Sequence, residues 1–112
     1  MTNDDNQLFL LVKQNDRSAF DSIFRKYYVQ LCRFAYRFLL SQELAEEIVQ
    51  DVFVRLWLQK NQINISNSLL AYLYTAVRNQ SLNEIKKNRI HNYHLKESYK
   101  NQSLTEEINQ EN

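Results

Sequence analysis

Cysteine and histidine, two residue types that often carry catalytic or metal chemistry, are sparse in this sequence. Cys32 is the single cysteine, and the only histidines are His91 and His94. Two histidines three residues apart can share a helical face, but without cysteine or carboxylate partners nearby they make a poor metal site. The sequence also lacks a paired nucleophile and base, and a glycine-rich phosphate loop. We therefore expect no catalytic residues, no metal and no cofactor.

A different chemistry is available in the polar segment KNQINISNS, residues 60–68. Asn and Ser side chains satisfy nearby backbone groups and so favour a loop over regular structure. The same amide and hydroxyl groups can bind the edge of an unpaired base whose face stacks on an aromatic or apolar surface. The residues that offer such groups are Asn61, Gln62, Asn64, Ser66 and Asn67.

Positive charge is concentrated after this segment, although the whole chain carries only +1. Residues 76–100 contain six basic and two acidic side chains, a net charge of +4. Basic side chains neutralise phosphates and position a protein on nucleic acid without specifying sequence. We expect Arg78, Lys86 and Lys87 to follow a nucleic-acid backbone.

Residues 41–59 predict a helix with two different faces. Ser41 is a natural N-cap, and glutamates in the first turns favour the positive end of the helix dipole. A buried side is marked by the apolar residues Leu44, Ile48, Val49, Val52, Phe53, Leu56 and Trp57. Glu47, Gln50, Asp51, Val54 and Leu58 recur on another side, which could meet a partner. An ordinary solvated face, with Asp51 pairing with Arg55, is the alternative interpretation.

Three further helices complete the expected fold. The first covers about residues 6–14, with Leu8, Leu11 and Val12 as its apolar stripe. Asn15 suits the left-handed position that ends a helix, and Asp16 is a good N-cap for the second helix, residues 17–40. Ser66 or Ser68 caps the fourth, which runs to about residue 88.

The composition favours an all-α fold. The 112 residues fit one domain, and the absence of Gly and Pro argues against hairpins and barrels. We expect a compact bundle of about four helices in residues 1–90, with a polar extension in residues 91–112 that forms a linker or a loosely attached helix. We expect no secretory signal and no membrane span, and the lone Cys32, expected in the core, suits a reducing cytoplasm.

Three stretches resemble the second conserved region of the extracytoplasmic-function (ECF) group of bacterial sigma factors. The stretch VKQNDRSAFDSIFRKYYVQLCRFAYRFL is similar to its opening helix pair, with Asn15 in place of the usual glycine. AEEIVQDVFVRLW, residues 45–57, matches its clamp-binding helix nearly position by position. AYLYTAVRNQSLNEIKK, residues 71–87, resembles the helix that opens the minus-ten promoter element. The resemblance covers about residues 8–89.

The resemblance implies two partners, core RNA polymerase and promoter DNA. In the family, the clamp-binding helix docks on a coiled coil of the largest catalytic subunit of the polymerase. The corresponding residues here are Glu47, Gln50, Asp51, Val54, Arg55 and Leu58. An inhibitory anti-sigma factor is a third candidate partner, because the family often has one.

The family's loop before the last helix helps to capture a base flipped from the non-template strand of the minus-ten element. We expect residues 61–68, with Asn79 beneath them, to form that pocket. The expected DNA-binding residues are Asn61, Gln62, Asn64, Ser66, Asn67, Tyr74, Arg78, Asn79, Lys86 and Lys87. Core packing is the alternative role for Tyr74, and the expected one for Trp57 and Tyr72.

The sequence departs from the family's pattern at several positions. Tyr72 stands where the family usually has Trp, Asn83 replaces a typical Asp, and Thr75 replaces a frequent basic residue. Promoter contacts at the last two positions are therefore not expected to transfer. The family also normally carries a second helical domain that recognises the minus-thirty-five element, and nothing after residue 90 resembles it.

Two other classes of function stay open. One is a helical protein–protein interaction module or regulator whose acidic third helix docks a partner and which binds no DNA. The salt dependence of DNA binding would separate it from a sigma factor, because phosphate contacts release counterions. The other is a small helical enzyme, for which a deep pocket with perturbed titrating groups would be needed.

Overall fold

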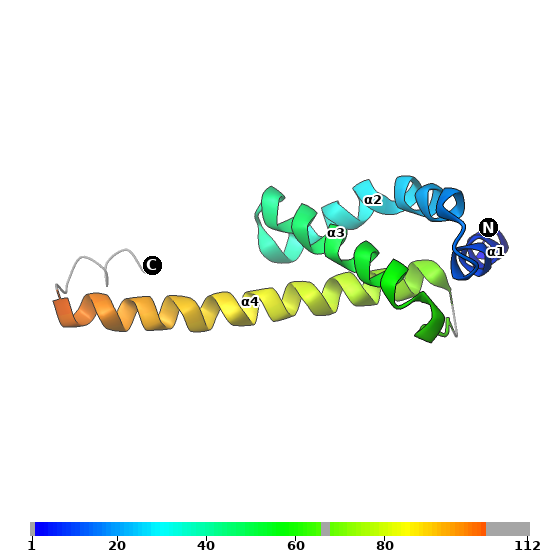
Figure 1. Cartoon of the computed structure of the whole chain (residues 1–112). Coiled ribbons are helices and arrows are strands. Elements are labelled where there is room, and N and C mark those ends of the chain that lie inside the picture. The colour runs from blue at the N-terminus through cyan, green and yellow to red at the C-terminus, as the bar shows by residue number, and fades with distance from the viewer. Residues whose placement is uncertain (1, 66–67, 103–112) are drawn as a thin grey trace. The chain divides into compact units, whose positions relative to one another are not determined.

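The computed structural model describes residues 2–65 and 68–102, and this part of the chain contains helices and no strand. The elements are α1 (Thr2–Lys13), α2 (Arg17–Leu39), α3 (Gln42–Leu58), the short 3-10 helix η1 (Lys60–Gln62) and α4 (Leu69–Gln102) (Figure 1). The predicted all-α fold is confirmed. The chain divides into two units, the first ending at Leu82 and the second beginning at Asn83 within α4.

The helix ends follow from local side-chain chemistry. The Asp16 carboxylate accepts a hydrogen bond from the Ala19 backbone N–H at 3.1 Å and caps α2. Ser41 Oγ caps α3 in the same way, and Ser68 Oγ accepts from the Ala71 N–H at 3.0 Å near the start of α4. Asn15 adopts the predicted left-handed conformation, with φ 69°. These caps relieve the unpaired N–H groups that begin a helix.

The core of the first unit is built from residues that recur at helical spacing. Aromatic side chains of α2 and α3 extend it, since Phe20 and Phe24 both pack against Phe53, at ring distances of 6.2 and 4.9 Å. Cys32 is buried, as predicted. The buried apolar residues of the helices are Phe9, Val12, Ala19, Ile23, Tyr27, Leu31, Cys32, Ala35, Ala45, Ile48, Val49, Val52, Phe53, Leu56, Leu69, Leu73 and Val77.

The predicted apolar stripe of the first helix is wrong in part. The helix begins at Thr2 instead of residue 6, and its buried positions are Asp5, Phe9 and Val12. Leu11, predicted to lie on the apolar stripe, is 41% exposed. Asp5, Phe9 and Val12 are four and three residues apart, so they share the inner face of the helix, and Leu11 faces outward.

The buried carboxylate of Asp5 explains this register. It accepts hydrogen bonds from the Tyr27 hydroxyl and, at 2.9 Å, from Lys26 Nζ, both on α2. Burial, reinforced by the bond to Asp5, raises the pKa of Tyr27. The same carboxylate raises the pKa of Lys26 by its hydrogen bond. A buried charge with two donors is satisfied, so Asp5 fixes α1 on α2.

The last helix is longer than predicted. It buries Leu69, Leu73, Val77 and Ser81 at steps of four residues, and it continues past the expected end near residue 88 to Gln102. No Gly or Pro interrupts it, which removes the usual helix breakers. Within the ranges described, no helix combines the length and apolar character of a membrane span.

Candidate functional site

The outward face of α3 carries the residues predicted to meet a partner. Glu47, Gln50 and Asp51 are exposed, and so are Val54 and Leu58, with 53% and 72% of their surface accessible. Of the apolar residues predicted for the opposite face, Leu44 and Trp57 are partly buried and the others are buried. The predicted division of this helix into a core face and an outward face is therefore confirmed, while its use as an interface stays a prediction.

Asp51 lies in a polar cluster on this face. It pairs with Arg55 one turn later, with 3.5 Å between Oδ2 and Nη2. With its side-chain amide in the orientation that satisfies both neighbours, Gln80 of α4 donates to Asp51 Oδ2 at 3.3 Å and accepts from Arg55 Nη1 at 2.8 Å. Exposed pairs of this kind contribute about 0–1 kcal/mol to stability, so a partner can replace them at little cost.

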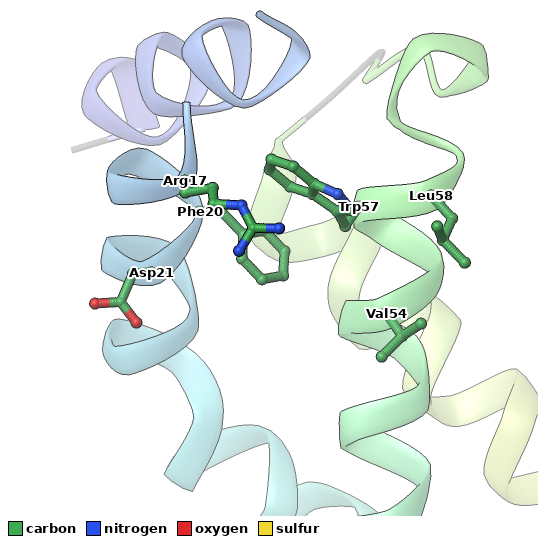
Figure 2. A pocket seen from close by; sticks show the side chains of 6 residues that line it. All are labelled: Arg17, Phe20, Asp21, Val54, Trp57 and Leu58. Atoms are coloured by element: carbon green, nitrogen blue, oxygen red, sulfur yellow. The ribbon is translucent and has the colours of Figure 1, made fainter. Parts of the chain in front are cut away.

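A cleft opens beside this face, between the start of α2 and the end of α3 (Figure 2). Its volume is about 430 Å³. The edge of the Phe20 ring meets Trp57, with 5.2 Å between ring centroids, and the Arg17 guanidinium lies 5.7 Å from the Trp57 ring. The residues that line it are Arg17, Phe20, Asp21, Val54, Trp57 and Leu58.

Between α3 and α4, residues 59–65 and 68 are described, and they are irregular except for η1, as predicted for a loop. Asn61, Gln62 and Asn64 are exposed, whereas Ile63 is buried and Ile65 packs against the core. The two isoleucines therefore anchor the loop to the core, while the side-chain amides of Asn61, Gln62 and Asn64 stay exposed to solvent. Ser66 and Asn67, also predicted to bind DNA, lie outside the described residues.

The part of α4 within the first unit presents the predicted polar pair. Arg78 and Asn79 are both exposed, and Arg78 Nη1 donates to Asn79 Oδ1 at 3.1 Å. Asn79 comes ten residues after Leu69, about 15 Å along a helix that rises about 1.5 Å per residue. A pocket shared by Asn79 and the loop thus requires the loop to fold back along α4, and this pocket stays a prediction.

The aromatic residues of α4 are partly buried. Tyr74 packs edge-on against Phe34 at 4.7 Å, and its hydroxyl accepts a hydrogen bond from Gln30 Nε2 at 2.9 Å. Tyr72 packs against the core, and burial raises its pKa. Core packing is therefore confirmed for Tyr72, and the contacts of Tyr74 leave part of its ring accessible for a further role.

In the second unit, Lys86 and Lys87 are exposed. Lys87 Nζ lies 4.0 Å from Glu84 Oε1, at the limit of an ion pair, so both ammonium groups are accessible to an anion. The side chains of His91 and His94 lie outside the described residues.

Comparison with known protein families shows to which family the chain belongs. The family model for sigma-70 region 2 matches residues 23–90, which is more than half of the chain. The chain belongs to the sigma-70 region 2 family. The match includes α3, the loop after it and the part of α4 that bears Arg78, Asn79 and both lysines.

One curated relative is a sigma factor of the ECF group. This sigma-70 region 2 chain is 28% identical over 78 residues to the ECF RNA polymerase sigma factor SigW of Bacillus subtilis (strain 168). The alignment covers 70% of this chain and 42% of the relative, so the chain spans less than half of that protein's length. No solved structure matched the chain.

Several residues of this sigma-70 region 2 chain escaped the sequence interpretation. Lys60 was assigned to the polar loop, yet it is buried, and its Nζ donates to the Trp57 carbonyl at 3.0 Å and lies 4.1 Å from the Trp57 ring. It stabilises the negative end of α3. On the second helix, Phe20 was expected only in the apolar core stripe, and Arg17 and Asp21 had no expected role, because only the packing of α2 on α3 creates the cleft.

Proposed function

We propose that this chain binds core RNA polymerase through the outward face of α3 and recognises and melts the minus-ten promoter element through its loop and α4. The observation that carries the proposal is the accessibility of Glu47, Gln50 and Asp51 in a chain of the sigma-70 region 2 family. Had these three side chains been in the core, no clamp contact could form. We further propose that residues 1–90 act as this domain and work in the cytoplasm.

The chemistry of α3 suits a protein partner. Val54 and Leu58 offer apolar surface that gains free energy when it is covered, and Glu47 and Asp51 provide negative charge beside them. A coiled coil on the clamp of the largest catalytic subunit would cover the apolar pair and match the carboxylates with basic side chains. Charges of this kind set orientation and association rate more than affinity.

The chemistry of the loop and α4 suits single-stranded DNA. Arg78, Lys86 and Lys87 are exposed cations that can neutralise phosphates. Asn61, Asn64 and Asn79 are exposed amides, which can donate to and accept from the edge of an unpaired base. Cations would hold the strand, and amides would distinguish its bases.

Melting in this proposal requires no covalent chemistry. Flipping a base costs a few kcal/mol of unstacking, and the protein recovers that cost by binding the flipped base and the adjoining backbone. The single strand is thus stabilised relative to the duplex. In this proposal the chain acts by binding energy alone and needs no catalytic group.

The experiment that tests the polymerase contact is a pull-down of core RNA polymerase by the chain carrying Asp51→Arg. We expect the variant to lose most of its binding, because a cation replaces a carboxylate that faces basic groups. Gln7→Arg, which adds a cation at an exposed site on α1, is the control and should bind normally. Circular dichroism should show that both variants stay helical. Undiminished binding by Asp51→Arg would contradict the proposal.

A regulator that binds only protein is the second candidate function. The exposed apolar residues of α3 support it as well as they support a sigma factor. It makes no use of the exposed cations on α4, and it predicts no salt-dependent binding to a minus-ten single strand.

A further inference from the structure

The cleft between α2 and α3 has the build of a receptor for one side chain. Its floor is aromatic, because Phe20 and Trp57 meet edge to face there, and both rings are only partly buried (Figure 2). Arg17 and Asp21 contribute charge from α2. Apolar concavities with a few charged groups at the edge are where anchoring side chains bind.

The cleft is continuous with the outward face of α3. Val54 and Leu58 belong to both, and they are among the most exposed large apolar residues of the described chain. A partner that lies along the outward face must therefore pass over the cleft. A partner that left the cleft empty would cover Val54 and Leu58 without packing atoms against them, and the dispersion contacts of a well-packed interface would be lost.

The charge of α3 restricts which partner fits. The whole helix has a net charge of −3, and its outward face carries the carboxylates Glu47 and Asp51 beside one cation, Arg55. At the cleft, Arg17 and Asp21 of α2 balance each other. A helix with basic residues around an apolar anchor is complementary to this surface, whereas an acidic helix is repelled.

We propose that this cleft receives a large apolar side chain from a basic helix of core RNA polymerase, and that Phe20 and Trp57 form its floor. The inference rests on the proposed function and deepens it, since it adds Arg17, Phe20 and Trp57 to the polymerase interface. None of these three was expected there, and Trp57 was expected only to pack in the core.

Trp57 is the single tryptophan, so it can report on the cleft directly. The chain is produced with 5-fluorotryptophan, and its ¹⁹F resonance is followed while unlabelled core RNA polymerase is added. We expect a resonance at a new chemical shift that grows in proportion to the bound fraction; broadening alone follows from the slow tumbling of the complex and is not counted. An unchanged chemical environment of Trp57 in the saturated complex would overturn the inference. So would a shift that depends on the concentration of the chain alone, because the occupant would then be a second copy.

A pair of substitutions tests whether the cleft must be vacant. Val54→Trp fills it from α3, whereas Val29→Trp places the same ring at a similarly exposed valine of α2 that does not line this cleft. We expect Val54→Trp to weaken polymerase binding by about tenfold or more, the effect of excluding one anchor. Val29→Trp should stay within about twofold of the unsubstituted chain. Equal binding by the two variants would overturn the inference.

The two levels of the proposal fail in different ways. If the unsubstituted chain does not bind core polymerase, the proposed function is wrong and the inference fails with it. If the chain binds and Asp51→Arg does not, while Val54→Trp binds normally and Trp57 is unaffected, the interface stands and only the cleft is excluded from it.

Discussion

The outward faces of α3 and α4 are made by the same helical geometry but from different residues. On α3, exposed Val54 and Leu58 stand beside exposed carboxylates. On α4, Arg78 and Asn79 are exposed and bonded to each other. The α3 face gains free energy when water is removed from it, whereas the α4 face suits a hydrated polyanion. Burial positions each face, and only the outward residue types decide what it can bind.

The first way to break this comparison is to remove the cations. The combined substitution of Arg78, Lys86 and Lys87 by Ala should weaken binding to a minus-ten single strand at every salt concentration. Because about 0.7 counterions are released per phosphate contact, the slope of log K against log salt should become shallower by about 2. Fluorescence anisotropy across a salt series measures both quantities. A slope that does not change would show that these side chains make no phosphate contacts.

A second substitution sharpens the comparison by separating base recognition from charge. Asn79→Ala should weaken single-strand binding by about tenfold, the lower end of what a base contact contributes, and should leave the salt slope unchanged. Asn6→Ala, at an exposed asparagine of α1, is the matched control and should have no effect. Unchanged strand affinity and unchanged open-complex formation in Asn79→Ala would contradict its assignment.

A substitution in the buried Asp5–Tyr27 cluster should change the stability of the fold and leave binding at both faces intact. Tyr27→Phe removes the hydroxyl that donates to the buried Asp5 carboxylate, and should lower the free energy of unfolding by about 1–3 kcal/mol. Urea denaturation measures the loss. Polymerase and DNA binding should both persist where the variant is folded. Selective loss of one activity would mean that this cluster belongs to an interface.

The smallest expected effect is a pH dependence from the same cluster. The pKa values of Tyr27 and Lys26 are raised above their ordinary 10.0 and 10.5, so the folded chain holds both protons more tightly than the unfolded chain. The stabilisation is complete below about pH 10 and is lost as the pH rises through the folded pKa values. Urea midpoints at about pH 8 and about pH 11 should therefore differ less in Tyr27→Phe than in the natural chain. An equal difference would exclude Tyr27 as a contributor.

The sequence predicted the features that depend on near neighbours. Asp16, Ser41 and Ser68 cap helices because each acts on a backbone group three residues away. The two faces of α3 could be predicted because its apolar residues recur over enough turns to show which side of the helix is buried. The first helix is too short for that. Leu11 was wrongly assigned to its apolar stripe because the true register depends on the contact between Asp5 and Tyr27, 22 positions apart.

The features that were missed depend on tertiary packing. No local pattern shows that the start of α2 meets the end of α3, so the cleft lined by Arg17, Phe20 and Trp57 could not be predicted. Lys60 appears in the sequence as one more polar loop residue, and its burial depends on the position of the Trp57 ring. The extension of α4 to Gln102 was underestimated because polar composition was given more weight than the absence of Gly and Pro.

One measurement tests the separation of the two faces most directly. Core polymerase is mixed with the natural chain, with Asp51→Arg or with Asn79→Ala, and its binding of a labelled minus-ten non-template oligonucleotide is measured. The amount of chain in each complex is quantified as well. We predict that the natural chain enters the complex and captures the strand, that Asn79→Ala enters but captures it weakly, and that Asp51→Arg does not enter. Normal entry of Asp51→Arg, or normal capture by Asn79→Ala, would contradict the account.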